Sequence, residues 1–554
     1  MRASGPRGGP RSAAADPRHE IFIEKVSRSI AELQSNVNNL ADVMVFLEVL
    51  GYNDRDAKNE GFADLFDLAQ EVYQRVDYYD EAETDEASKA EERKIPVPSA
   101  RKRLIESLSL ATPWLGALAL LYAFGVSLWL AWGLPIASVT ALMVGVLLGL
   151  LISEGPLQAF TRIFMFYQAQ GNMSECSRAL KRSYFALVLL LAASVGILVA
   201  SSVLLAVPPT LTALAAVGAV TISLHRIGFL PIYALKKTKV IVVSYGIALP
   251  LLAAVYFLTP AFFPDLVIRY LVALGAGLSV LSVFAWYYST RSLVVQASYA
   301  VGKDIPSFYK PAFVNVDTIR SRFSVQFWEA LPQYLFGTFF FVMIFGDRVL
   351  SWIANPVKAA GGVVLPMLFN SVYHAGADLA LGVMFPVAIV QYVLLSSIHE
   401  ELNNLSLDLP VTNTEEVDSF IRGKHARIMI ITLGVAGFSA LLAVLYGPIL
   451  MARVGGSPIS IRILYIAAVA DIFLSVFVVN SSFIMLLNRP KTLAALAGVG
   501  ASVVVAFGVI LMPLGFQFIV YSYLAACFAA ALGSTVVTWG LLRSPSSLFY
   551  SRFI

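Results

Sequence analysis

Long apolar segments, separated by short polar loops, fill the chain from residue 108 to residue 541. An α-helix rises about 1.5 Å per residue and the hydrocarbon core of a bilayer is about 30 Å thick, so one crossing needs about 20 apolar residues. Twelve segments meet this requirement, and each predicts a transmembrane helix. They span residues 108–131, 134–160, 184–207, 210–234, 240–262, 267–289, 328–353, 364–396, 428–450, 460–487, 492–513 and 516–541.

The composition indicates a membrane protein of the helical class. Apolar residues make up 58% of the chain, charged residues make up 14%, and the mean hydropathy is +0.74. A soluble domain needs a more polar surface than this composition supplies. Transmembrane β-strands are alternating segments of about ten residues, so the longer segments here predict an all-α integral membrane protein. A long polar region precedes the first apolar segment, so we do not expect a cleaved signal peptide.

The distribution of basic residues predicts the orientation of the helices. If the N-terminus lies in the cytoplasm, the loops on that side contain the basic residues of 101–103, 178–182 and 236–239, among others. Cytoplasmic loops of membrane proteins carry an excess of Lys and Arg, and the excess here is roughly fourfold. We therefore expect a multi-pass protein of the plasma membrane with both termini in the cytoplasm.

The region before the first crossing predicts a separate helical module. Residues 1–18 lack an apolar period and predict a disordered basic tail, and residues 81–104 predict an acidic linker. Between them, residues 19–80 predict two amphipathic helices, the first with the apolar spacing of a coiled coil. The apolar positions are Ile23, Val26, Ile30, Leu33, Val37, Leu40, Met44 and Leu47, then Leu65, Leu68, Val72, Val76 and Tyr79.

Two interpretations of this module remain open. In the first, the two helices form a hairpin within the chain. In the second, the module docks a second copy or a cytoplasmic partner, for example a glycosyltransferase. The basic tail is also suited to contact with anionic lipid headgroups.

The twelve crossings divide into two sets of six at a polar loop, residues 290–327. The sets occupy residues 105–289 and 328–543, and a short tail, residues 544–554, follows. In both sets a long second helix continues into a polar segment. Each set enters and leaves the membrane on the same side, so the predicted repeat is parallel and has its axis along the membrane normal. We expect a cleft between two six-helix lobes.

Ionisable groups within the crossings are candidates for function. A charge at the centre of a membrane helix costs about 2.5–3.5 kcal/mol on insertion scales, so it is expected to face a cleft or a partner. We predict that the following residues line a substrate path or bind an ion: Glu154, Arg162, His225, Arg226, Asp347, Arg348, His374, Asp378 and Asp471.

Each of these groups has a structural alternative. Glu154 and Arg162 are two helical turns apart, so they either form an ion pair or separate. In the second case Arg162, His225 and Arg226 supply positive potential for an anionic lipid headgroup or sugar polymer. Asp471 lies in an apolar segment and either couples transport to a proton or sodium ion or is a neutral, hydrogen-bonded carboxyl.

The sequence lacks several motifs of known chemistry. It contains no HExxH zinc motif, no GxxxxGK[ST] phosphate-binding loop and no GxSxG nucleophile elbow. We therefore expect neither ATP-driven transport nor enzymatic activity, and no metal, cofactor or nucleic-acid partner. The only cysteines, Cys176 and Cys527, predict ordinary thiols instead of a disulfide.

Four short motifs, in order along the chain, resemble those of one transporter family. They are Pro113-Trp114 in the first helix, Phe160-Thr161-Arg162 after the second, Asp347-Arg348 near the end of the seventh, and Tyr373 with Ala377 to Pro386 in the eighth. They are similar to motifs of the Pel exopolysaccharide transporter (PelG-like) family. That family belongs to the multidrug/oligosaccharidyl-lipid/polysaccharide (MOP) flippase superfamily.

The resemblance covers residues 105–543 and implies twelve helices in two lobes with a substrate path between them. It implies export or flipping of a polysaccharide or lipid-linked glycan by rocker-switch alternating access. The sequence departs from the family at Ile163, where an aromatic residue is usual, and in its long N-terminal region. The alternatives are a membrane scaffold that recruits a glycosyltransferase and a drug or cation exporter of the same superfamily.

Overall fold

The computed structural model describes residues 22–27, 29–30, 40–50, 52–76, 97–131, 133–169, 173–235, 237–300, 323–354, 367–408, 414–453 and 456–550. Over these residues the regular structure is helical, apart from one isolated bridge between Val126 and Ala131. Twelve helical segments are long and apolar enough to cross a membrane, and each overlaps a predicted crossing. The predicted tail 1–18 and most of the loop 290–327 lie outside the described residues.

The first six crossings are α6 (Ala100–Phe124), α7 (Ile136–Ala169), α8 (Met173–Leu204), α9 (Pro209–Gly228) with α10 (Leu230–Ala234), α11 (Thr238–Leu258) and α12 (Leu266–Ala300). The seventh crossing is α13 (Phe323–Ile353). The eighth begins with α14 (Ser371–Ala380) and continues through η4 (Leu381–Val383), α15 (Met384–Leu395) and α16 (Ile398–Asp408). The last four are α17 (Thr414–Arg453), α18 (Pro458–Leu486), α19 (Pro490–Leu511) with η5 (Met512–Leu514), and η6 (Phe516–Phe518) with α20 (Val520–Leu541); α21 (Pro545–Tyr550) follows.

The first crossing begins and ends earlier than the sequence predicted. The Ser99 side chain accepts a hydrogen bond from the Lys102 backbone N–H at 3.3 Å, which caps the start of α6. The helix ends at Gly125, which has a left-handed backbone with φ of 70°. Glycine adopts this conformation without a Cβ penalty and commonly ends helices. The predicted helical structure of residues 125–131 is therefore wrong.

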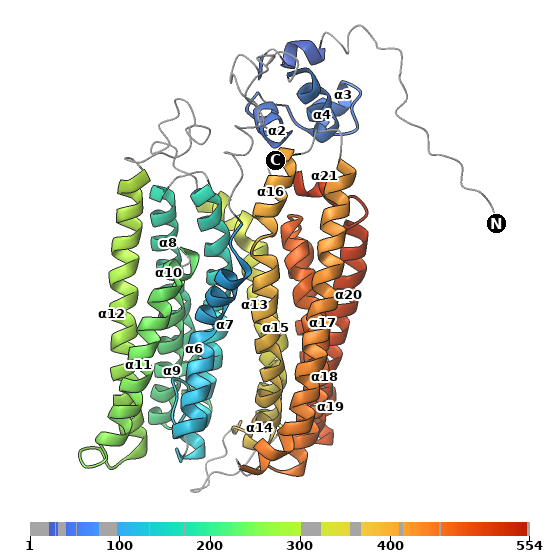
Figure 1. Ribbon diagram of the computed structural model, residues 1–554. Helices are drawn as coiled ribbons and strands as arrows, with labels where there is room; N and C mark the ends of the chain where they lie inside the picture. Colours follow the sequence, from blue (N-terminus) through green and yellow to red (C-terminus); the bar gives the residue numbers. More distant parts are fainter. Residues whose placement is uncertain are drawn as a thin grey trace, which may run out of the picture.

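The same helix pairs form in both halves of the chain. The second crossing packs on the fourth (α7 on α9, α14 on α18), the fifth on the sixth (α11 on α12, α19 on α20) and the first on the fifth (α6 on α11, α13 on α19). Figure 1 shows the first set, coloured blue to green, beside the second, coloured yellow to red. The chain forms two six-helix lobes, the N-lobe (α6–α12) and the C-lobe (α13–α20).

Glycine permits a close backbone approach at an equivalent place in each lobe. A Cβ atom added to Gly145 of α7 would lie 2.0 Å from the carbonyl oxygen of Ala215 on α9. A Cβ added to Gly376 of α14 would lie 2.3 Å from the carbonyl oxygen of Ser460 on α18. Small residues allow membrane helices to pack this closely. The pairing of the second and fourth crossings therefore depends on these glycines.

Gly145→Ala is expected to destabilise the protein by about 1–3 kcal/mol, because α7 and α9 must separate to admit the methyl group. Gly434 of α17 provides the matched control, since a Cβ there meets no atom within 4 Å. Gly434→Ala is expected to leave stability unchanged or slightly raised. Thermal unfolding in detergent micelles measures both effects. Equal melting temperatures for the two variants would contradict this account of the packing.

The lobes meet along two helix pairs, α7 with α13 and α6 with α15. Each pair consists of the second crossing of one half and the first crossing of the other. A rotation that places each half on the other therefore also places each pair on the other. Gly155 of α7 lies against the ring of Tyr334, and Gly337 of α13 lies against Glu154 and Gln158. The interface is thus pseudo-symmetric about an axis along the bundle, as expected for a parallel repeat.

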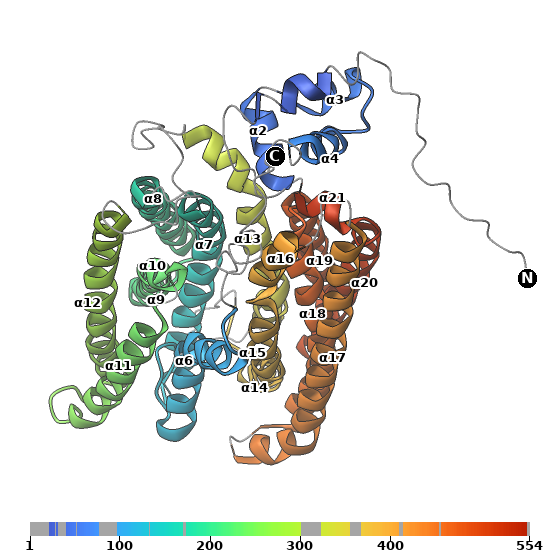
Figure 2. The same ribbon diagram turned by 45° about the horizontal axis from the view of Figure 1, so that its top comes forward.

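An N-terminal module, defined as described residues 22–76, lies at one end of the bundle (Figures 1 and 2). It contains α2 (Leu40–Val49), α3 (Asp54–Asn59) and α4 (Leu65–Val76), and α2 packs on α4. Leu33, Val37 and Tyr79 lie outside the described residues, so the coiled coil stays a prediction. The predicted apolar positions that are buried are Ile23, Val26, Ile30, Leu40, Met44, Leu47, Leu65, Leu68 and Val72.

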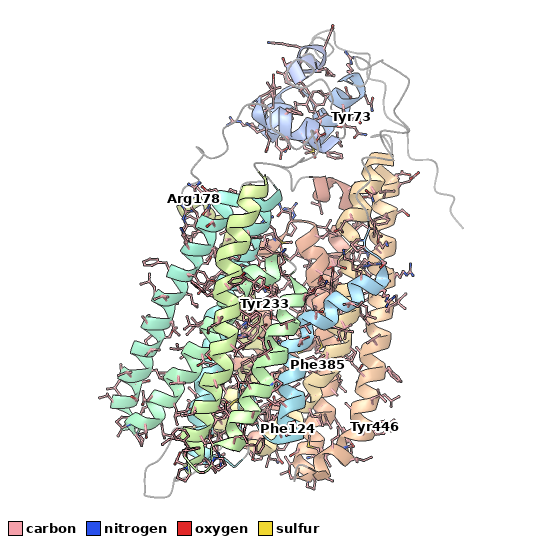
Figure 3. The ribbon with its side chains drawn as sticks, turned by 60° about the vertical axis from the view of Figure 1, so that its left-hand side comes forward. Tyr73, Phe124, Arg178, Tyr233, Phe385 and Tyr446 are labelled. Atoms are coloured by element: carbon pink, nitrogen blue, oxygen red, sulfur yellow. The ribbon has the colours of Figure 1, made fainter. Side chains whose placement is uncertain are left out.

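We call the end of the bundle next to this module the module end. In Figure 3, Tyr73 marks the module, whereas Phe124 and Tyr446 lie toward the opposite end of the helices. The buried apolar side chains of the module belong to one cluster with side chains of α16, α17 and α18. The module is therefore joined by the chain to the N-lobe but is packed against the C-lobe.

Candidate functional site

A buried ion pair joins two helices of the N-lobe. Arg226 of α9 donates from Nη2 to Oε2 of Glu154 on α7, and Gln158 donates to the other carboxylate oxygen at 2.8 Å. The Glu154 side chain is 5% exposed and the Arg226 side chain 17%. A buried carboxylate is stable when its charge is paired and its lone pairs accept hydrogen bonds. We call these three residues the N-lobe cluster.

The N-lobe cluster touches the other lobe. The Arg226 guanidinium lies over the ring of Phe341 on α13, 5.1 Å from its centroid, which is cation–π geometry. Gly337 of α13 packs against Glu154. The charged pair therefore lies at the interface between the lobes, where a relative movement of the lobes changes its surroundings.

His225, the neighbour of Arg226, faces another direction. Its Nε2 is hydrogen-bonded to the hydroxyl of Tyr245 on α11, inside the N-lobe. Tyr245 is fully buried. The sequence grouped His225 with Arg226 because they are adjacent, but adjacent residues on a helix point about 100° apart. In the structure only Arg226 of the two contacts the C-lobe.

Arg162 is not part of the N-lobe cluster. The side chain of Arg162 is exposed, and within the described ranges no ion pair involves it. Of the two alternatives for Glu154 and Arg162, the structure shows the one in which they are separate, with Glu154 paired to Arg226. The two residues are eight positions apart on one helix, which is a rise of about 12 Å, too long for direct contact.

A second charged group, the C-lobe cluster, surrounds Arg348 of α13. The guanidinium donates to the carboxylates of Asp378 at 2.9 Å and Asp347 at 3.0 Å, and to the carbonyl oxygens of Ile344 at 2.7 Å and Ala377 at 3.0 Å. Arg348 and Asp347 are fully buried. Because its donors are engaged within the protein, Arg348 links α13 to α14 in this structure, and its place in a substrate path stays a prediction.

His374 and Asp378 of α14 complete the C-lobe cluster. The indole N–H of Trp352 donates to His374 Nε2 at 2.8 Å, and His374 Nδ1 lies 2.7 Å from Asp378 Oδ2. An indole only donates, so Nε2 accepts and the proton of a neutral His374 is on Nδ1, which donates to Asp378. The Asp378 side chain is 48% exposed. An exposed carboxylate within a crossing is expected to face water instead of lipid.

Asp471 of α18 is fully buried beside this cluster. The Tyr523 hydroxyl of α20 donates to Asp471 Oδ1 at 2.6 Å, and Arg348 lies over the Tyr523 ring, 5.8 Å from its centroid. Among the described residues, Asp471 Oδ2 has no hydrogen-bond partner. A buried oxygen without a partner is costly, and a bound proton or cation would remove that cost, so ion binding at Asp471 stays a prediction.

Sequence reasoning missed the neutral groups of these clusters. Gln158, Trp352 and Tyr523 donate to ionisable residues of the clusters, and Tyr373 donates to Asp347 Oδ2 at 2.6 Å. Each is a tryptophan, tyrosine or amide in an apolar helix, so its polar group needs a partner when buried. That requirement was a signal in the sequence, although it does not identify the partner.

The motif residues have different roles in the structure. Trp114 stacks on Trp129 at 5.4 Å beside Pro113 in α6, and Phe160 packs on Phe164 at 5.4 Å within the N-lobe. Thr161 Oγ1 donates to the Leu157 carbonyl at 2.8 Å. Of the motif residues, Asp347, Arg348 and Asp378 belong to the C-lobe cluster, and Tyr373 donates to Asp347.

A shallow apolar groove of about 380 Å³ runs between α6 and α11. Several of its lining residues are glycines and alanines. Tyr245, which also lines it, is hydrogen-bonded to His225. The groove is lined by Thr112, Gly116, Ala119, Leu120, Ala123, Phe124, Tyr245, Gly246, Leu249 and Pro250.

No protein-family model and no curated protein matches the chain. Solved structures do have a similar fold. A MATE transporter in complex with MaL6 has a TM-score of 0.56 at 13% identity, and the match covers 81% of this chain and 98% of that one. An outward-facing multidrug resistance MATE family transporter of the MOP superfamily has a TM-score of 0.54 at 14% identity, with 81% and 97% covered.

A third similar structure is a MOP superfamily transporter from Pyrococcus furiosus, described as having a binding pocket of reverse polarity. Its TM-score is 0.54 at 14% identity, and the match covers 80% of this chain and 95% of that one. The expected two-lobe fold of the MOP superfamily is therefore confirmed. The finer resemblance to the PelG-like family stays a prediction.

Proposed function

We propose that the protein is a membrane transporter that moves a polysaccharide or lipid-linked glycan by alternating access. The observation that carries this proposal is the N-lobe cluster, a buried charged pair at the contact between two lobes of a MATE-like fold. Rocking of the lobes about a central site moves Arg226 away from Phe341 of the opposite lobe. The cluster is then presented to a substrate from one side of the membrane at a time.

The substrate class is inferred from the composition of this interface. Ligand sites are mostly apolar and aromatic, with a few polar groups that orient the ligand. Arg226 and Asp378 supply polar groups of both signs, and the half-buried Phe341 and Phe345 supply aromatic surface beside Arg226. This combination suits a sugar polymer, in agreement with the family resemblance. The groove between α6 and α11 suits the hydrocarbon tail of a lipid-linked substrate.

A deletion experiment tests the proposal. In cells that keep their glycosyltransferases, loss of the gene is expected to abolish surface polysaccharide, and normal levels would refute the glycan as substrate. Complementation separates transport from the scaffold alternative. A scaffold requires residues 1–100 and tolerates the double variant Glu154→Gln and Arg226→Gln, which removes both charges and so leaves neither unpaired. A transporter loses export in this variant at an equal protein level in the membrane, because the substrate path loses its charged groups.

Ion coupling is proposed to depend on Asp471, whose unpaired oxygen is the acceptor for a proton or sodium ion. Asp471→Asn is expected to reduce gradient-driven transport in proteoliposomes at least about tenfold, because the amide cannot exchange a charge across the cycle. Separate proton and sodium gradients identify the ion. Glu329→Gln provides the control, since Glu329 is an exposed carboxylate of α13. Full gradient dependence in Asp471→Asn would exclude this role.

A drug or cation exporter is the second candidate. The observation in its favour is the excess of carboxylates in the C-lobe, where Asp347, Asp378 and Asp471 surround one arginine, Arg348. An acidic site attracts cations. Export of cationic dyes by proteoliposomes, with no effect of gene deletion on surface polysaccharide, would favour this candidate.

A further inference from the structure

The eighth crossing is interrupted at Ser396 and Ser397, between α15 and α16. The last carbonyl groups of a helix have no partner within it. Here the Val393 carbonyl accepts a hydrogen bond from Arg103 Nη1 at 2.7 Å, and the same guanidinium donates to Ser397 Oγ. Arg103 belongs to α6, so one side chain of the N-lobe binds the interruption in the C-lobe.

This contact continues as a chain of polar groups toward α17. Ser397 Oγ donates to Glu401 Oε1 at 2.6 Å, and Glu401 forms an ion pair with Lys424. Nearby, the Tyr392 hydroxyl donates to Glu106 of α6 at 3.4 Å. At the module end the lobes are therefore joined by hydrogen bonds to the end of α15 and to Ser397, which precedes α16 and is itself bonded to Glu401 of α16.

Apolar burial sets the position of α16. Ile398 is 3% exposed and Leu402 1% exposed, and both belong to the cluster that contains the buried side chains of the N-terminal module. Val417 and Ile421 of α17 belong to it as well. Figures 1 and 2 show the module over the ends of α16 and α21. The buried side of α16 thus belongs to an apolar cluster that its own lobe and the module form together.

We propose that the N-terminal module is an internal regulator of the gate at the module end. When seated, it buries the apolar side of α16 and keeps Ser397 within reach of Arg103, so the lobes stay closed at this end. When it leaves, Ile398 and Leu402 face water, α16 loses its fixed position and the Arg103 contact breaks. The inference rests on the proposed alternating access.

The burial of the module's apolar positions also determines how a partner protein could bind the module. Ile23, Val26 and Leu47, which are apolar positions of the predicted coiled coil, are each at most 2% exposed within the chain. A protein that bound these positions would have to replace their contacts in the cluster that also contains Ile398 and Leu402 of α16. Such binding would open the gate, which links a cytoplasmic partner to transport without any contact with the substrate path.

Distance measurements between spin labels test the proposal in the full-length protein. Cys176 and Cys527 are first replaced by alanine, and labels are attached at Lys102→Cys on α6 and Gly423→Cys on α17. Lys102 is exposed, and a Cβ at Gly423 meets no atom within 4 Å. Two variants unseat the module, Leu402→Asp from the bundle side and Leu47→Asp from the module side. Val45→Asp, at a position of α2 that is 40% exposed, is the matched control.

In both Leu402→Asp and Leu47→Asp, the ratio of long to short distances is expected to rise about tenfold, because each removes a buried leucine from the contact. Val45→Asp is expected to leave the ratio unchanged. An unchanged ratio in either of the first two variants overturns the proposal. The measurement needs no substrate. If the distance increases but the protein moves no glycan, only the proposed function is contradicted. If the protein transports glycan but the distance does not increase, only the proposed gate is contradicted.

Discussion

Arg348→Met is expected to destabilise the protein by about 3–5 kcal/mol, enough to prevent its accumulation in the membrane. The substitution leaves Asp347 fully buried without its arginine and removes the donor to Asp378. An uncompensated buried charge is the source of the cost, because the protein interior solvates it poorly. Thermal unfolding in detergent micelles and the yield of folded protein measure the effect.

An exposed ion pair provides the control for Arg348. The Arg422 side chain is 53% exposed and contacts Asp418 at 3.2 Å on the same helix. Arg422→Met is expected to cost at most about 1 kcal/mol, because water screens the pair. Adding Asp347→Asn and Asp378→Asn to Arg348→Met is expected to restore part of the lost stability, because the buried charges are then gone. Comparable losses for Arg348→Met and Arg422→Met would argue against a buried network.

A double-mutant cycle on Glu154 and Arg226 is expected to show strong coupling. Either Glu154→Gln or Arg226→Gln leaves one buried charge without its partner and should cost about 3–5 kcal/mol, whereas the double variant should cost less than the sum. The loss should be smaller for Glu154→Gln, because the Arg226 side chain is the more exposed of the two. Unfolding of the four proteins under one condition gives the coupling energy.

Arg162→Gln is the control within the same helix, since Arg162 is exposed and Glu154 pairs with Arg226. It is expected to change stability by no more than about 0.5 kcal/mol. A coupling energy near zero between Glu154 and Arg226, or a large one between Glu154 and Arg162, would show that the ion pair is not the one described.

The helices of this protein were predictable from the chain alone because the signal is local. Twenty apolar residues in a row are long enough to cross a bilayer wherever they occur, and all twelve predicted crossings are helices. The apolar positions of the N-terminal module were predictable for the same reason, since Leu65, Leu68 and Val72 lie on one face of a helix. The limits of the helices depend on single residues, such as the left-handed Gly125, and were less accurate.

The partners of the charged residues were not predictable from sequence patterns. An ion pair with Arg162 in the same helix was one alternative for Glu154, but its partner Arg226 is on α9, and Arg348 binds Asp378 on α14. Arg103 was read as one basic residue among many in the orientation signal, yet it binds the interruption after α15. Hydropathy and helical period describe one segment at a time and contain no information about which helix lies beside another.

By itself, the sequence determined that this protein is a twelve-helix membrane bundle with a helical module before it, because apolar length and period are properties of each segment. It also determined which ionisable groups lie in the crossings. Only the tertiary structure decided that Arg226 faces the other lobe while His225 faces α11, and that the module covers α16. The physical reason is that an ion pair or an apolar contact depends on distances of a few ångströms between segments far apart in the chain.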